Sequence, residues 1–241
     1  MSAAAAATGV AALLGLVAGS AVDRAAARYP WPTARRAGTR HRDARLSVVA
    51  AAPPTQDHRA GERPATRPVP VLLTAALCAL TALRFGASAE LPAYLLLVVA
   101  GVLLAAIDRD HHLLPNRVVL PTLVAGAVLL SGAAAVTGEW PALIRAGLAA
   151  AAVFAVLLGM ALVSPAGIGM GDVKLGAVLG LNLGWLGWPH VLLGLSAGFV
   201  VQALLALALM ATRRVGLHTE LPFGPALLLG TGLVVLAPLV I

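Results

Sequence analysis

The chain has 241 residues, of which 60% are hydrophobic and only 11% are charged. This composition excludes an ordinary soluble domain and indicates a polytopic membrane protein. The formal net charge of +7 is no sign of nucleic-acid binding, because ten of the 17 basic residues lie between positions 24 and 67 and aromatic residues make up only 4% of the chain. A basic segment beside a hydrophobic span is typical of a loop that faces anionic lipid.

The first predicted element is an apolar run, residues 3–22, which is long enough to cross a bilayer. A signal peptide is the competing interpretation, but no basic residue precedes the run, and Asp23, Arg24 and Arg28 follow it. Positive charge after the span predicts that its N-terminus lies outside.

Residues 24–68 change character and are rich in Arg, Pro, Thr, Asp and His. Few apolar residues are available there for a packed core, so we expect a solvated and partly disordered loop. His41 and His58 lie in it without neighbours at metal-ligand spacing, and we interpret them as solvent-exposed.

From residue 69 onward, apolar segments alternate with connectors that carry turn residues. The chain is therefore predicted to form an all-α, polytopic transmembrane helical bundle of about eight spans. The predicted spans are residues 3–22, 69–85, 91–107, 118–136, 142–163, 173–186, 191–211 and 221–241. These divide the chain into a first span (1–23), a basic loop (24–68) and a membrane core (69–241).

The basic residues predict the orientation of the bundle. If the crossings alternate from an outside N-terminus, fifteen Lys and Arg residues lie on the cytoplasmic side. Only Arg84 and Arg145 lie outside. Such an excess follows the positive-inside rule and predicts a multi-pass membrane protein with the basic loop in the cytoplasm.

The most informative stretch is Gly-Ile-Gly-Met-Gly-Asp-Val-Lys-Leu at residues 167–175. Asp172 and Lys174 form an ionisable pair in an apolar sequence, and such a pair marks a functional site by default. Gly169 and Gly171 remove side chains beside the carboxylate, so a neighbouring helix or a substrate backbone can approach it. The alternative is that Asp172 caps the next helix while Lys174 reaches for lipid phosphate.

Two further features of this region bear on its role. Lys174 is the only lysine in the chain, which suggests that a compact ammonium is needed there to tune the Asp172 carboxylate. Gly176, Gly180 and Gly184 follow at intervals of four residues. They form a stripe of small residues that predicts close packing of this span against a neighbour.

A second carboxylate, Asp108, stands at the predicted end of the third span. Two crossings separate it from Asp172, so both acids are expected at the same membrane surface. Two carboxylates that share a proton form the arrangement of aspartic proteases, in which one activates water and the other polarises the scissile carbonyl. The alternative places Asp108 and Asp110 in a solvated turn beside Arg109.

The residues next to Asp108 bear on which acid of this region faces the interior of the bundle. If the span stays helical, residues two apart point about 200° from each other, so only one of Asp108 and Asp110 can face the bundle. Helix geometry alone leaves this choice open, and Asp108 is preferred because it directly follows Ile107. The adjacent His111 and His112 point about 100° apart and cannot readily chelate one ion, so no metal is expected.

These motifs together resemble the prepilin peptidases, the type IV leader peptidase family of GxGD membrane aspartic proteases. Residues 169–175 match its GxGDvKl signature, and Asp108 followed after five residues by Leu114-Pro115-Asn116 matches its first-aspartate pattern. Residues 222–225 resemble its PFGP element, and residues 15–20 with 28–30 resemble its N-terminal stretch.

The resemblance implies an enzyme that cleaves the leader peptide of type IV pilin-like precursors, either prepilins or pseudopilins of a secretion system, at the cytoplasmic face. It makes residues 69–241 a peptidase core, with Asp108 and Asp172 catalytic and five supporting residues: Gly169, Gly171, Lys174, Pro115 and Asn116. Its expected partners are the precursor and the lipid bilayer, with no nucleic acid, metal or cofactor.

Methyl transfer is not expected. Bifunctional members of the family carry paired CxxC motifs in the basic loop, whereas the single cysteine of this chain, Cys78, lies in an apolar run. Two other classes compete with a peptidase. A small transporter would place its rare charges near the bilayer midplane rather than at helix ends, and a non-catalytic assembly component would need neither aspartate.

Overall fold

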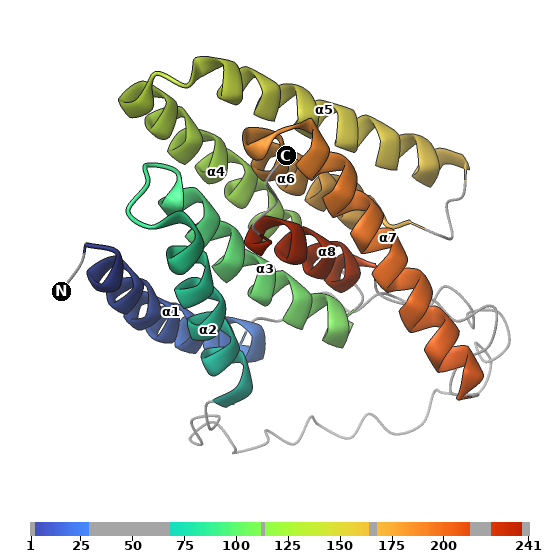
Figure 1. Ribbon diagram of the computed structural model, residues 1–241. Coiled ribbons are helices and arrows are strands. Elements are labelled where there is room, and N and C mark those ends of the chain that lie inside the picture. The colour runs from blue at the N-terminus through green and yellow to red at the C-terminus, as the bar shows by residue number, and fades with distance from the viewer. Residues whose placement is uncertain (1–2, 29–67, 112–113, 164–167, 213–222, 238–241) are drawn as a thin grey trace, which may run out of the picture.

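The computed structural model describes residues 3–28, 68–111, 114–163, 168–212 and 223–237, which form helices and no strand (Figure 1). Alanine and leucine favour helices, and a helix satisfies its own backbone groups where lipid cannot. The eight helices are α1 (Ala3–Arg28), α2 (Pro68–Phe85), α3 (Leu91–His111), α4 (Asn116–Thr137), α5 (Trp140–Val163), α6 (Met170–Leu186), α7 (Trp188–Ala211) and α8 (Gly224–Leu236). The predicted all-α bundle is therefore confirmed.

Six of the helices in the described part of the chain are long and apolar enough to cross a membrane, namely α1 to α5 and α7. The chain is a multi-pass membrane protein. The other two of the eight expected spans are shorter helices, α6 with 17 residues and α8 with 13. At 1.5 Å per residue, α8 extends over only about 20 Å, less than the roughly 30 Å of a hydrocarbon core.

The boundaries differ from the sequence prediction mainly at charged residues. α1 continues to Arg28 and thus includes residues that the sequence assigned to the basic loop. The alanines of that stretch favour helix although its charges interrupt the apolar run. Most of the loop, with His41 and His58, lies outside the described residues, so its predicted character and the three-part division of the chain stay predictions.

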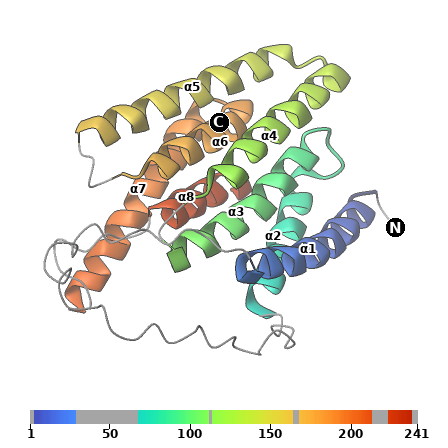
Figure 2. The same ribbon diagram turned by 180° about the vertical axis from the view of Figure 1, so that it is seen from behind.

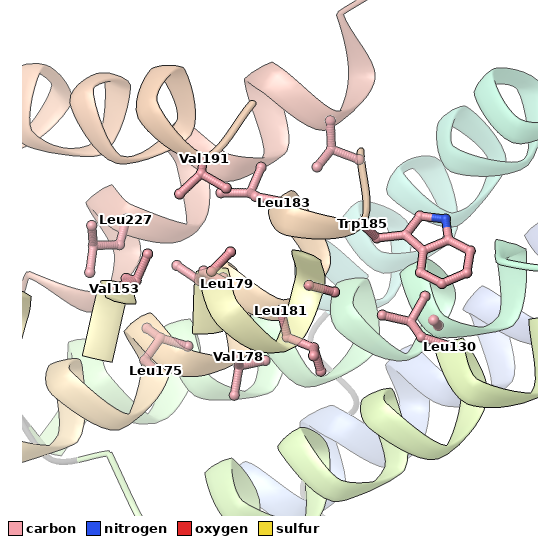
Figure 3. Close-up of a cluster of buried hydrophobic side chains, with 14 of the residues drawn as sticks. Leu130, Val153, Leu175, Val178, Leu179, Leu181, Leu183, Trp185, Val191 and Leu227 are labelled. Atoms are coloured by element: carbon pink, nitrogen blue, oxygen red, sulfur yellow. The ribbon is translucent and has the colours of Figure 1, made fainter. Parts of the chain in front are cut away.

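The central helix of the bundle is α6, in which 13 of the 17 residues are buried. A helix that is apolar on all sides is expected in the interior of a bundle rather than at its surface. Figure 3 shows its side chains directed at several neighbouring helices. The labelled residues come from α6 (Leu175, Val178, Leu179, Leu181, Leu183, Trp185) and from α4 (Leu130), α5 (Val153), α7 (Val191) and α8 (Leu227).

The predicted glycine stripe of α6 packs against α5. A Cβ atom at Gly180 would lie 2.8 Å from the carbonyl oxygen of Ala149, and one at Gly184 would lie 2.9 Å from Cα of Ala146. Because these neighbours are backbone atoms, larger residues would force the two helices apart. The stripe therefore fixes α6 closely on α5, as its spacing predicted.

Polar side chains hold the C-terminal end of α6. Arg145 of α5 donates hydrogen bonds from Nε to the Gly184 carbonyl (2.8 Å) and from Nη2 to the Trp185 carbonyl (2.7 Å). These satisfy carbonyls of the last turn, which have no partner within the helix. The Tyr94 hydroxyl of α3 donates to the Asn182 carbonyl at 2.9 Å. α3 and α5 are thus joined to α6 at the end away from Asp172.

The short helix α8 lies against α3, α6 and α7 (Figure 2). Its middle approaches α7 so closely that a Cβ atom at Gly230 would lie 2.6 Å from Cα of Gly198. At its N-terminus, the Phe223 ring packs on Phe199 of α7 with 5.1 Å between centroids. Leu227 is fully buried. These contacts determine where the first turn of α8 lies.

Candidate active site

Two buried carboxylates stand at helix ends that meet in the bundle. Asp108 lies near the end of α3 with 5% of its surface exposed, and Asp172 lies in the first turn of α6 with 9% exposed. α3 remains helical to His111, beyond its predicted end at residue 107. Acidic residues are almost never buried to this degree without a specific role.

The structure brings these carboxylates together against the first turn of α8. The position of a Cβ atom on Gly224 would be 2.9 Å from Asp108 Oδ2 and 3.4 Å from Asp172 Oδ1. The two oxygens are therefore no further apart than the sum of these distances. At such a separation in a buried setting, one negative charge strongly disfavours the other.

Leu114, in the connector before α4, forms an apolar wall of this site. Its Cδ1 atom is 3.4 Å from the same Cβ position of Gly224. A Cβ atom at Gly171 would lie only 2.6 Å from Leu114 Cβ, so glycine at 171 is what lets Leu114 pack here. An apolar side chain beside the two acids lowers the local dielectric constant and so strengthens the interaction between them.

Gly169 stands on the other side of Asp172 and is exposed. It is the N-cap of α6, and its carbonyl accepts the hydrogen bond of the Asp172 backbone N–H at 3.0 Å. A Cβ atom there would lie 3.4 Å from Asp172 Oδ2, which is an ordinary contact distance. The two glycines thus have different settings, since Gly171 is closely packed while Gly169 borders an open side of the carboxylate.

A hydrogen bond links the two sequence motifs outside the acidic pair. Lys174 Nζ donates to Asn116 Oδ1 at 2.8 Å, which joins the start of α6 to the start of α4. Pro115 precedes Asn116 in an extended conformation, and its carbonyl accepts the backbone N–H of Val118 at 2.9 Å. Residues two apart on a helix point in nearly opposite directions, and the hydrogen bond of Lys174 goes to Asn116 rather than to Asp172. That the charge of Lys174 tunes the Asp172 carboxylate stays a prediction.

The Asp172 carboxyl has a strongly raised proton affinity. It lies at the start of α6, outside the six long helices. Burial first, and then the negative charge of Asp108, raise its pKa from 3.8 to about 7, while the backbone N–H of Gly169 acts in the opposite direction. The pair can therefore hold one proton near neutral pH, which is the condition for acid and base chemistry at one site.

The site contains two residues that the sequence did not assign to it, Leu114 and Gly224. The PFGP element was noted as a resemblance only, yet its glycine, Gly224, contacts the space between the two acids. Its signal in the sequence was a glycine between prolines directly before a short apolar run. Nothing in that pattern says which part of the bundle it meets.

Some predictions lie outside what the structure describes. The Asp110 side chain and residue His112 are among these. Within the described residues, no three His, Cys, Asp or Glu side chains come together as metal ligands. That the site works without a metal stays a prediction.

Comparison with known proteins identifies the part of the chain that carries this site. Residues 95–212 match the type IV leader peptidase family. A prepilin leader peptidase/N-methyltransferase of Bacillus subtilis is 34% identical over 170 residues, which are 68% of this chain and 63% of the relative. The protein of the same name in Aeromonas hydrophila is 36% identical over 165 residues, 66% of this chain and 54% of the relative.

A further relative of that name, in Pseudomonas putida, is 34% identical over 167 residues, 67% of this chain and 55% of the relative. The chain thus spans less than two thirds of the length of these curated relatives. No solved structure matches it. The matched segment contains both Asp108 and Asp172, and the chain belongs to the type IV leader peptidase family.

Proposed function

We propose that this protein is a membrane aspartic endopeptidase that removes the leader peptide of type IV pilin-like precursors, prepilins or pseudopilins. The observation that supports this most directly is the pair of buried carboxylates that α3 and α6 hold against each other. The family match and the names of the relatives point to the same activity and to a prepilin as its substrate.

The chemistry follows from one proton held between Asp108 and Asp172. The ionised carboxylate takes a proton from water, and the protonated one donates a hydrogen bond to the scissile carbonyl. The water oxygen attacks the carbonyl carbon to give a tetrahedral intermediate. Its collapse breaks the C–N bond, and the leaving amine takes a proton from the pair. Asp172 is the natural proton donor because its pKa is raised to about 7.

The site is proposed to face the cytoplasm at the bacterial plasma membrane. Between Asp108 and Asp172 lie α4 and α5, and both are long enough to cross a bilayer. Two crossings return the chain to the side that it left. The excess of basic residues on the same side as both acids supports a cytoplasmic position. The proposed partners are the pilin-like precursor and the lipid bilayer.

Processing of a pilin-like precursor by single variants at matched membrane abundance tests this function. Asp108→Asn and Asp172→Asn should each abolish cleavage, because the single remaining carboxyl group cannot both activate water and polarise the carbonyl. Asp110→Asn should cost little. Cleavage that persists in either of the first two variants would overturn the proposed pair. An inactive Asp110→Asn variant beside an active Asp108→Asn variant would move the site by two residues.

The same experiment separates the other classes of function. A transporter or a non-catalytic assembly component would leave the precursor uncleaved even with both aspartates in place. Purified wild-type protein should therefore cleave the precursor without other components.

A further inference from the structure

The first turn of α8 approaches the acidic pair more closely than it could if residue 224 had a side chain. Gly224 is buried, and a Cβ atom on it would lie 2.9 Å from Asp108 Oδ2. Such a distance is shorter than real Cβ contacts, so something would have to move. The same position lies 3.4 Å from Asp172 Oδ1. Gly224 therefore stands where α8 meets both carboxylates.

The backbone of α8 has little freedom to withdraw from this contact. Phe223, directly before Gly224, is buried and packs on Phe199 of α7. One turn later, Leu227 is fully buried, and Gly230 approaches the α7 backbone at Gly198. By contrast, the Asp108 carboxylate is the end of a side chain with rotatable bonds. A methyl group at residue 224 would therefore displace the carboxylate rather than the helix.

We propose that Gly224 is a positioning residue for the acidic pair, because its missing side chain lets the first turn of α8 close on Asp108 and Asp172 and sets the separation of the two carboxylates. This inference rests on the proposed peptidase function. Its physical basis is the geometric demand of the reaction, since a displacement of about 1 Å at a reacting group can cost about 100-fold in rate.

α8 supplies its own control variants. Gly232 has nothing within 4 Å of its Cβ position, so Gly232→Ala adds the same methyl group to the same helix without a clash. Gly230→Ala would clash with the α7 backbone and measures a packing defect of α8 away from the acids. Gly224→Ala differs from both in that the atom it meets belongs to a reacting group.

The test measures kcat and KM for a prepilin-like peptide with the purified full chain in detergent. Gly224→Ala should lower kcat by about 10- to 100-fold with KM changed less than about twofold. Gly232→Ala should leave both near wild-type values. A kcat for Gly224→Ala equal to that of Gly232→Ala, or a loss in kcat/KM that comes from KM alone, would overturn the proposal.

A stability measurement tests the same contact without using activity. If the methyl group at 224 meets the Asp108 carboxylate, Asp108→Ala should make room for it. Gly224→Ala should then lower the thermal midpoint in the wild-type background and do so much less in the Asp108→Ala background. If Gly224→Ala alone does not fold, folding should return in the double variant. Equal effects in both backgrounds would reject the contact.

These outcomes distinguish failure of the inference from failure of the proposed function. Active Asp108→Asn or Asp172→Asn proteins would reject the peptidase mechanism whatever Gly224→Ala does. Inactive aspartate variants beside an unaffected Gly224→Ala would reject only the role of Gly224.

Discussion

Lys174 Nζ donates a 2.8 Å hydrogen bond to Asn116 Oδ1, which connects two residues 58 positions apart in the chain. One belongs to the glycine motif that carries Asp172, and the other closes the Leu-Pro-Asn motif that follows Asp108. The bond joins the N-terminal ends of α6 and α4, and Leu114 packs on Gly171 beside it. The supporting residues of the two motifs thus form one structure around the acidic pair.

The first prediction concerns this bond. Lys174→Met and Asn116→Ala should each lower kcat/KM for precursor cleavage by about two- to fivefold, since a partly exposed charged hydrogen bond contributes about 1 kcal/mol or less. Because both variants remove the same bond, the double variant should be no worse than the poorer single one. Losses that multiply in the double variant would show that the two residues act independently.

The second prediction concerns pH. Burial and the charge of Asp108 raise the pKa of Asp172 to about 7. The mechanism needs one proton on the pair, so cleavage should be retained just below this value, where one carboxyl is still ionised, and lost as the pH rises through it. A pH profile of kcat/KM, which reports the free enzyme, should therefore fall above about pH 7.

Glu139→Gln is a suitable control for that profile. Glu139 is exposed in the turn between α4 and α5, so this substitution should not shift the pH at which kcat/KM falls. A wild-type rate that stays constant from pH 6 to well above the pKa of Asp172 would contradict the shared proton.

Much of the fold could be predicted because lipid simplifies the problem. Each long apolar run was expected to form a helix, because a helix satisfies all backbone groups within one segment in a bilayer. The spacing of Gly176, Gly180 and Gly184 indicated a packing face. Counting crossings then placed Asp108 and Asp172 at one surface. The structure agrees with this count in that α4 and α5, the two helices between the acids, are both long and apolar enough to cross a membrane.

The remaining features depend on contacts that no local pattern encodes. The sequence marks the end of an apolar run at Ile107, but the helix continues through Asp108 because hydrophobicity, not helix propensity, changes there. Lys174 was paired with Asp172 from their proximity in sequence, whereas helix geometry turns it toward Asn116. The position of Gly224 follows from how α8 packs on α7, which is a matter of tertiary structure.

The third prediction separates the two glycines of the motif. Gly171→Ala should lower the thermal midpoint as well as the activity, because its Cβ atom would lie 2.6 Å from Leu114 Cβ and Leu114 would have to move. Gly169→Leu should leave the midpoint near wild type, since Gly169 is exposed, but should raise KM by covering the open side of Asp172.

Gly132 on α4 provides the matched control. It is exposed, and its Cβ position has nothing within 4 Å, so Gly132→Leu should change neither KM nor the thermal midpoint appreciably. If Gly169→Leu behaves like Gly132→Leu, the substrate does not approach Asp172 from the side of Gly169.

The fourth prediction is that this chain cleaves its substrate without methylating the new N-terminus. The relatives are named as both peptidase and N-methyltransferase. The only cysteine of this chain, Cys78, is buried in α2, and residues 24–68 contain none. The paired cysteines of the bifunctional members are therefore missing from the basic loop. Mass spectrometry of a mature pilin made with this enzyme alone should show a free amine.

The comparison needs a substrate that is known to be methylated, so the same precursor should be processed in parallel by the Bacillus subtilis relative. Both products should start at the same residue, and only the relative's product should be heavier by one methyl group. A methylated product from this chain would show that transfer does not depend on the missing cysteines. An unmethylated product from both enzymes would show that this precursor is not a substrate for methylation. A second precursor would then be used for the same comparison.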